Sequence, residues 1–108
     1  MARLSWTEPA LHDLDALADY IALDKPDAAR RYVQRVFQAV ERLAMFPKSG
    51  SIPPEIPHLP YRQVVVPPGR VFYRIDQEDI LVIFVMRSEE RLRGVDFAIT
   101  TGSDHESH

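Results

Sequence analysis

The second half of the chain carries apolar runs that predict strands with two apolar faces. Residues 80–86 contain no polar side chain, whereas a strand with one face in water alternates apolar and polar residues. Residues 61–66 and 70–76 read as two further strands, separated by the turn Pro67-Pro68-Gly69, which suits a type II conformation, and followed by a turn over residues 76–79. We expect an antiparallel meander whose sheet needs a cover on each side.

Apolar residues at helical spacing occupy the first half. Thr7 suits the N-cap of a first helix, and Pro26 ends it, because the residue before a proline is pushed out of the helical conformation. Its apolar stripe is Leu11, Leu14, Leu17 or Ala18, and Ile21. A second, longer helix from Pro26 to about Phe46 has the stripe Tyr32, Val33, Val36, Val40 and Leu43. The short link between them predicts an antiparallel helical hairpin.

The remaining segments complete the element order. Residues 3–6 are a short β-prone opening, and residues 47–60 hold five of the nine prolines, as a stiff connector between helices and sheet. Residues 88–90 are able to begin a short C-terminal helix. We therefore predict an α+β fold of order β-α-α-β-β-β, with the helical hairpin packed on one face of an antiparallel sheet.

Composition narrows the class of protein. At 108 residues and 45% hydrophobic content, the chain suits one domain, residues 1–101, followed by a disordered polar tail, residues 102–108. There is no cysteine, and no histidine pair has metal-ligand spacing, so we expect neither a metal nor another cofactor. The sequence holds no leader-like segment and no apolar run of about 18 residues. We expect a cytoplasmic protein that does not enter a membrane.

Charge is divided unevenly between the two predicted helices. The first is acidic through Glu8, Asp13, Asp15, Asp19 and Asp24, and the second is basic through Arg30, Arg31, Arg35 and Arg42. We interpret both as solvated faces with some weak ion pairs across the hairpin. The net charge of the chain is −3. A protein that grips many phosphates is clearly basic, so this balance argues against extensive nucleic-acid contact.

Strand alternation sorts the side chains of the predicted sheet into two faces. With Val65 placed toward the helices, the side chains that point away from them are Arg62, Val64 and Val66. On the next strand the same open face receives Arg70, Phe72 and Arg74, and the helical side receives Val71, Tyr73 and Ile75. Guanidinium groups beside apolar residues are typical of an interface. The open face is therefore a candidate surface for a partner.

Several short segments occur in an order and spacing that identify a family. They are Trp6-Thr7, Asp19-Tyr20-Ile21, Pro26-Asp27-Ala28-Ala29, Leu43 to Gly50, Tyr61-Arg62 and Arg70 to Asp76. Together they resemble the RelE/ParE superfamily of bacterial toxins from type II toxin-antitoxin modules, over roughly residues 3–93. The resemblance implies a helical hairpin on one side of an antiparallel sheet. It also implies a protein partner, a cognate antitoxin whose C-terminal segment wraps and neutralises the toxin in a hetero-oligomer.

The resemblance leaves two targets open, because the superfamily divides into ribosome-dependent mRNA endonucleases of the RelE type and DNA gyrase inhibitors of the ParE type. An endonuclease needs groups that exchange protons and stabilise a pentavalent phosphate. RelE-like members carry lysines on the strand that begins here at Tyr61, but that strand keeps only Arg62. A metal-independent endoribonuclease built on this chain would have to use Arg62, Arg70, Arg87 and Tyr73. Arginine is too basic to exchange a proton readily.

We favour the ParE-like reading. The segment after the final strand, residues 87–91, lacks the histidine of many superfamily members and adds two carboxylates. We therefore predict a toxin that inhibits DNA gyrase and is not itself an enzyme, with ribosome-dependent mRNA cleavage as the alternative and a non-toxic interaction module as a third. The residues expected to bind antitoxin or target are Arg62, Val64, Val66, Arg70, Phe72, Arg74, Arg87 and Arg91.

Overall fold

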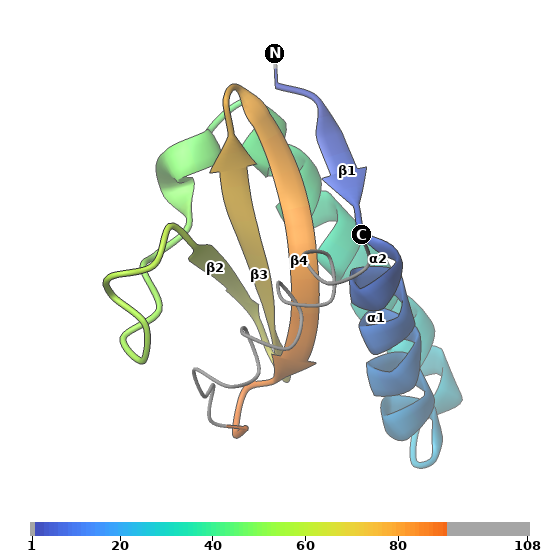
Figure 1. The fold of residues 1–108 in the computed structure, drawn as a ribbon. Helices are drawn as coiled ribbons and strands as arrows, with labels where there is room; N and C mark the ends of the chain where they lie inside the picture. Colours follow the sequence, from blue (N-terminus) through green and yellow to red (C-terminus); the bar gives the residue numbers. More distant parts are fainter. Residues whose placement is uncertain (1, 91–108) are drawn as a thin grey trace, which may run out of the picture.

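A computed structural model describes residues 2–90, and these form two layers, a helical hairpin and a four-stranded sheet (Figure 1). The elements in chain order are β1 (Leu4–Trp6), α1 (Glu8–Ala22), α2 (Pro26–Glu41), the short 3-10 helices η1 (Arg42–Ala44) and η2 (Pro47–Ser49), β2 (Arg62–Val66), β3 (Gly69–Asp76) and β4 (Asp79–Arg87). This order and the α+β class confirm the prediction. The expected polar tail and Arg91 lie outside the described residues, and the chain forms a turn, not a helix, at Ser88 and Glu89.

The sheet is mixed and not wholly antiparallel as expected. Its strand order is β1-β4-β3-β2, and β1 runs parallel to β4 with Leu4 opposite Ile80. The amide of Ile80 donates to the carbonyl of Arg3 at 2.8 Å, and the amide of Thr7 donates to the carbonyl of Val82 at 3.1 Å. These bonds join segments more than 70 positions apart, which no local pattern in β1 could indicate.

Both helices form for the reasons that their sequences indicate. The hydroxyl of Thr7 accepts a hydrogen bond from the amide of Ala10 at 3.2 Å and so caps α1. Pro26 occupies the first turn of α2, where its missing amide hydrogen is not needed. The predicted stripe of α1 is wrong at Leu11, which is exposed, and Ala10 is the buried residue at that level.

The helical hairpin covers one face of the sheet (Figure 1). The buried cluster between the two layers includes Leu14, Leu17, Tyr32, Val36, Val40, Val66, Val71, Tyr73, Val82 and Val85. Gly69 allows the layers to approach, because a Cβ atom there would collide with the hydroxyl of Tyr32 and come within 2.8 Å of Leu17.

The turn before Gly69 differs from the expected type II form: Pro67 and Pro68 are joined by a cis peptide bond, and Gly69 has no positive φ.

The opposite side of the sheet, here called the second face, is also apolar. Phe72 pairs with Phe84 and Tyr73 with Val82, so Ile83 is an extra residue in β4 and forms a β-bulge. As a result, Ile83 and Phe84 both join the cluster on the second face, which also contains Phe72, Ile56 and Tyr61, with Leu59, Leu81 and Met86 packed against it. The sheet therefore has an apolar cluster on each side, as the uninterrupted apolar run predicts.

The proline-rich connector is more than a stiff crossover. Its residues Ile56 and Leu59 pack on the second face, and Ser51 forms a single antiparallel bridge with Gln63 at the free edge of β2. The connector thus covers part of the face for which the sequence offers no helix. This role was not expected from the prolines alone.

The predicted facing of β2 is wrong. Val66 is buried in the helical cluster and Val64 packs against it, whereas Gln63 and Val65 lie opposite Phe72 and Arg70 and belong to the second face. Arg62 pairs with Tyr73 and lies on the helical side. The facing of β3 agrees with the prediction, since Arg70, Phe72 and Arg74 lie opposite Met86, Phe84 and Leu81.

Candidate functional site

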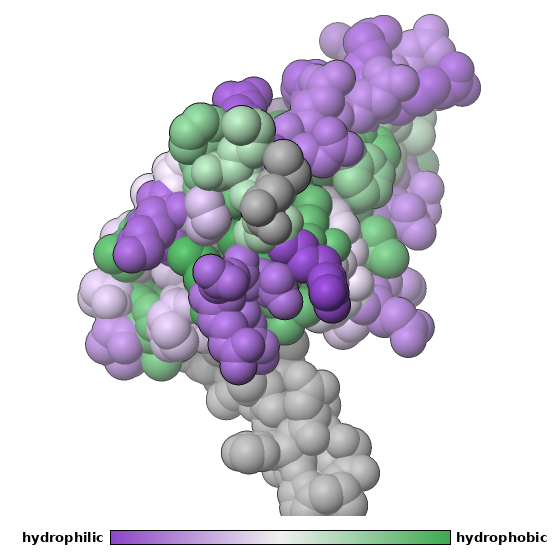
Figure 2. Space-filling model, turned by 90° about the horizontal axis from the view of Figure 1, so that it is seen from above, coloured by the Kyte–Doolittle hydropathy of each residue, from purple (hydrophilic) through white to green (hydrophobic). Residues whose placement is uncertain are grey.

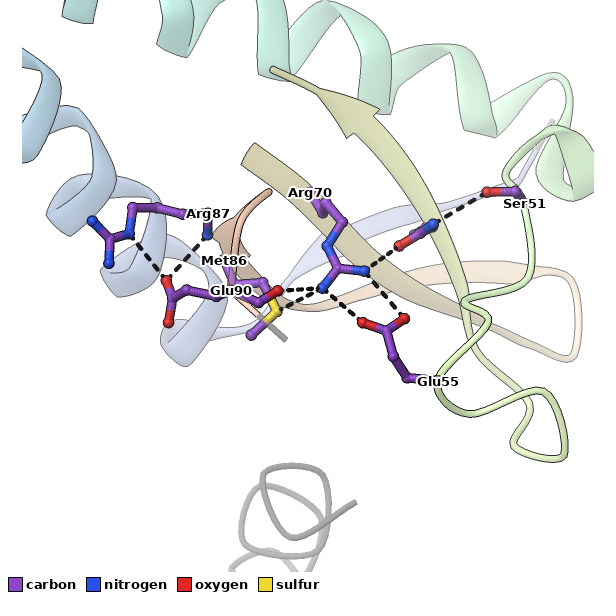
Figure 3. A network of polar contacts seen from close by, with 7 residues as sticks. Ser51, Glu55, Arg70, Met86, Arg87 and Glu90 are labelled. Carbon is purple, nitrogen blue, oxygen red and sulfur yellow. Dashed lines mark hydrogen bonds and ion pairs between the residues drawn. The ribbon is translucent and has the colours of Figure 1, made fainter. Parts of the chain in front are cut away.

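Arg70 is the polar centre of the second face (Figure 3). Its two Nη atoms form a bidentate pair with the Glu55 carboxylate, at 3.0 and 3.3 Å. They also donate to Gln63 Oε1 at 3.1 Å, the Glu90 carbonyl at 2.8 Å and the Met86 sulfur at 3.4 Å. The guanidinium further lies 5.1 Å from the ring centre of Phe72. One side chain of β3 thereby ties the connector to the end of β4.

These contacts leave Arg70 unable to act as a free clamp for phosphate. Its exposed fraction is 8%, and both Nη atoms donate within the fold. Its Nε atom is buried and has no hydrogen-bond partner among the described residues. A bidentate pair with a carboxylate is a strong contact, and breaking such a pair in a buried position is destabilising. Arg70 therefore acts first as a structural fastener of the connector.

Tyr73 and Arg62 brace the beginning of the connector from the helical side. The Tyr73 hydroxyl donates to the Pro47 carbonyl at 2.6 Å and accepts from the amide of Gly50 at 3.0 Å. Burial raises the pKa of Tyr73, while the Gly50 hydrogen bond opposes the rise. Arg62 Nη1 donates to the carbonyl of Gly50 at 2.8 Å. A buried hydroxyl with both sides engaged is poorly placed to give a proton to a substrate.

Arg87 lies at the end of β4, beside α1 and not on the second face. Its Nε atom is 3.4 Å from Glu89 and 3.3 Å from Glu90, and its guanidinium lies 4.8 Å from the ring centre of Tyr20. It lines a groove of about 510 Å³ between α1 and β4, together with Asp13. The two carboxylates beside it lower the attraction of this end for RNA. The four residues named for nuclease chemistry are thus dispersed over three parts of the fold.

Asp13 accepts a backbone hydrogen bond at the edge of β4, beyond the point where β1 ends. Strand β1 pairs with β4 only as far as Val82, and the Asp13 carboxylate accepts the amide hydrogen of Val85 at 3.2 Å. Burial raises the pKa of Asp13 above its ordinary value, and the bond from Val85 opposes this. The carboxylate therefore satisfies an amide that no strand reaches.

The part of the second face that the connector leaves open carries apolar residues and one further guanidinium. Leu81, Met86 and Arg74 are half-buried, and Val65 has an exposed fraction of 52%. Among the described residues no hydrogen bond or ion pair joins Arg74 to a partner. The prediction missed Val65, Leu81 and Met86. A correct facing of β2 would have found Val65, whereas the bulge at Ile83 puts Leu81 and Met86 on one face although plain alternation would separate them.

A second apolar area lies at the end of the molecule that carries the turn between β3 and β4. Met45 and Phe46 are exposed there, and with Ala44 and Ile75 they line a hollow of about 740 Å³. Figure 2 looks onto this end and shows apolar residues reaching the surface among hydrophilic ones. Exposed apolar areas with a polar border are typical of surfaces that meet other proteins.

Residues 2–90 contain no group of three or more histidine and carboxylate side chains placed to hold an ion. Within the same residues, no helix has the length and apolar character that crossing a bilayer requires.

Comparison with known proteins gives consistent matches over most of the chain. Residues 4–92 match the family model of the ParE toxin of the type II toxin-antitoxin system parDE. The chain is 38% identical to a putative toxin, Y4kP, of Sinorhizobium fredii, over 82% of this chain and 91% of that protein. It is also 37% identical to the toxin RelE2 of Caulobacter vibrioides, over 85% of this chain and 100% of that protein.

A solved structure shares the fold. A chain of the chromosomal ParDE toxin-antitoxin system from P. aeruginosa superimposes with a TM-score of 0.70 at 27% identity, covering 82% of this chain and 98% of that chain. The region that matches the family model, residues 4–92, contains α1, α2 and the four strands of the sheet. The chain belongs to the ParE toxin family of type II toxin-antitoxin systems.

Proposed function

We propose that this toxin acts through protein interfaces, as a ParE-like inhibitor of DNA gyrase in the cytoplasm, and that a cognate antitoxin neutralises it by covering the second face. The observation that carries the proposal is the composition of that face. Its open part consists of Val65, Leu81 and Met86 beside the guanidinium of Arg74. Such a surface suits an apolar segment that carries a carboxylate.

The placement of the candidate nuclease residues supports the same proposal. Arg70 is engaged by Glu55, Tyr73 is buried under the connector, and Arg87 is paired with Glu89 and Glu90. An RNA cleavage site needs a proton-exchanging group within hydrogen-bond reach of a bound ribose. The strands β2, β3 and β4 contribute no histidine or lysine to the second face for that step.

The antitoxin part of the proposal draws on the family and on the shape of the sheet. The structural relative comes from a ParDE system, in which toxin and antitoxin belong together. In this chain the connector covers only part of the second face, and Val65 stays exposed. An antitoxin segment over Val65, Leu81 and Arg74 would bury apolar area and pair the remaining guanidinium.

Expression in bacteria tests the target. We expect induction of the chain to arrest growth, to relax plasmid supercoiling, and to leave the 5′ ends of cellular mRNA unchanged. Expression of the antitoxin encoded beside the gene should restore growth. Growth arrest with new mRNA ends and normal supercoiling would contradict the gyrase proposal.

Arg74→Ala tests the surface. Arg74 is half-buried and makes no described ion pair, so its removal should leave the fold intact and weaken antitoxin binding about tenfold. Binding is measured by titration calorimetry, and the fold by circular dichroism. Arg70→Ala is unsuitable for this purpose, because it also releases the connector. Unchanged affinity of Arg74→Ala would place the antitoxin elsewhere.

A second candidate function is ribosome-dependent mRNA cleavage. The observation that favours it is the 37% identity to a relative named toxin RelE2. The same expression experiment separates the two, since mRNA cleavage at the ribosome produces new 5′ ends within coding sequences.

A further inference from the structure

Four exposed arginines, three on α2 and one at the start of η1 directly after it, contribute charge that the fold does not neutralise. They are Arg30, Arg31, Arg35 and Arg42. The ion pairs expected between them and the acidic residues of α1 do not form: among the described residues, salt bridges involve Arg70 and Arg87 alone. The two helices therefore present opposite charges to their surroundings and not to each other.

Three of these arginines share one stripe of the helix. With 3.6 residues per turn, positions 31 and 35 of α2 fall within a narrow sector, and position 42, the helical C-cap of α2, continues it. Position 30 lies about 100° or more around the axis. Arg35 fixes the direction of the stripe, because its Nη2 donates to the Pro67 carbonyl at 3.0 Å, next to β2. The basic stripe thus follows the side of the molecule where β2 forms the edge of the sheet.

An apolar groove lies beside this stripe. It has a volume of about 420 Å³ between the end of α2 and β2, and its lining includes Arg42, Ala39, Phe46, Val64 and Val65. Phe46 has an exposed fraction of 58%, so the groove has an accessible aromatic wall. The groove therefore combines a cation with an apolar floor.

Val65 links the groove to the second face. Its side chain belongs to that face, opposite Arg70, and it also lines the groove. At the outer edge of β2 the amide and carbonyl of Gln63 bond to Ser51, at 2.8 and 2.9 Å. Because the bonding direction alternates along an antiparallel strand, the amide and carbonyl of Val65 point to the same outer edge. A segment lying on the second face could continue around β2 into the groove.

We infer that the groove between α2 and β2 binds an acidic, amphipathic segment of the antitoxin, with carboxylates on the stripe of Arg31, Arg35 and Arg42 and aliphatic side chains against Phe46 and Val65. The inference relies on the proposed function for the protein that carries this segment. The acidic and amphipathic character of the segment is inferred from the residues of the groove and the stripe. A nucleic acid fits less well, because the cations border apolar side chains and the neighbouring helix is acidic.

Matched charge reversals test the inference. Arg42→Glu changes the groove at the end of α2, and Arg30→Glu makes the same change on another side of α2. We expect Arg42→Glu to raise the Kd for the antitoxin encoded beside the gene about tenfold, mainly through faster dissociation, and Arg30→Glu to change it less than about twofold. Thermal unfolding followed by circular dichroism checks that both variants fold. Equal effects of the two variants would overturn the inference while the proposed function stands.

Failure of the antitoxin to bind would count against the proposed function. Two further probes then test the groove independently. One is a synthetic helical peptide with leucines on one face and glutamates on the other, compared with a twin that carries glutamine in place of glutamate. The other is a short DNA duplex. We expect the wild-type chain to bind the glutamate peptide, Arg42→Glu to lose this binding, and the twin and the duplex to bind at least tenfold more weakly. No binding of the glutamate peptide, or tighter binding of the duplex, would overturn the inference.

Discussion

The two faces of the sheet are both apolar, but they are closed in different ways. The helical face is covered by α1 and α2, which bury a continuous cluster from Ala10 to Val85. The second face is covered in part by a connector without long helices, which Arg70 fastens through Glu55. The partial cover leaves Val65 exposed and Leu81 and Arg74 half-buried, and this open part is the surface that we propose the antitoxin covers.

The largest expected effect on the free energy of unfolding tests whether the apolar cluster of the second face stabilises the fold as the helical cluster does. Phe72 is fully buried and stacks on Phe84 at 4.8 Å between ring centres. Phe72→Ala should lower the free energy of unfolding by about 3–5 kcal/mol, because it removes a large buried side chain and leaves a cavity. The matched change on the helical face is Leu14→Ala. Urea denaturation of both gives the comparison, and a loss below about 1 kcal/mol for Phe72→Ala would show that the second face contributes little.

A smaller effect tests the fastening of the connector. Arg70→Met keeps the length of the side chain but leaves Glu55 without its bidentate partner. We expect a loss of about 2–3 kcal/mol in the free energy of unfolding, together with faster proteolysis of residues 51–60. Glu55→Gln combined with Arg70→Met should lose less than the sum of the two single changes. Additive losses would mean that the pair does not hold the connector.

Tyr73 and Tyr32, both buried on the helical face, allow a comparison of a hydrogen-bonded hydroxyl with one that has no partner among the described residues. The Tyr73 hydroxyl bonds to Pro47 and Gly50, whereas the buried Tyr32 hydroxyl has no partner among the described residues. Burial raises the pKa of Tyr32 to about 12. Tyr73→Phe should destabilise the fold by about 1–2 kcal/mol, and Tyr32→Phe should leave it unchanged or stabilise it by up to about 1 kcal/mol. Thermal and urea unfolding measure both, and equal losses would contradict this account of the two hydroxyls.

The smallest effect concerns Asp13 at the edge of β4. Because burial raises its folded pKa above the ordinary 3.8, ionised Asp13 costs stability, and this cost appears as the pH rises through the folded pKa. Asp13→Asn keeps an acceptor for the Val85 amide and removes the charge. We expect it to gain a few tenths of a kcal/mol at neutral pH, limited by solvent screening, and no advantage below the unfolded pKa.

The control for that experiment is Asp15→Asn, on the exposed side of the same helix. It makes the same chemical change at a carboxylate that, among the described residues, accepts no hydrogen bond from β4. A gain for Asp13→Asn that persists unchanged in acid would show that the charge is not its cause.

Local patterns in the sequence predicted much of the fold. Thr7 caps α1, the stripe Tyr32, Val36 and Val40 faces the core, and the apolar run of β4 packs on both sides. The cap, the helical stripe and the apolar strand each depend on residues that are close together in the chain, so a short segment of sequence is enough to predict them.

Other features depend on contacts between distant segments, and the sequence did not reveal them. Strand β2 contains three consecutive valines, Val64 to Val66, so its sequence shows no alternation of apolar and polar residues. The pattern therefore did not determine which side chains face the helices, and the prediction for β2 was wrong. The bulge at Ile83 breaks the period of β4, and the parallel pairing of β1 joins opposite ends of the domain. Of the candidate site residues on β2 and β3, Arg70, Phe72 and Arg74 lie on the expected face, whereas Arg62, Val64 and Val66 face the helices.

The most direct measurement adds the purified chain, in parallel, to a gyrase supercoiling reaction and to translating ribosomes. The account predicts loss of supercoiling at a stoichiometric concentration of toxin, intact mRNA in the ribosome reaction, and recovery of supercoiling when the antitoxin is added. Codon-linked cuts in the mRNA, with supercoiling unaffected, would contradict a toxin that acts through protein interfaces.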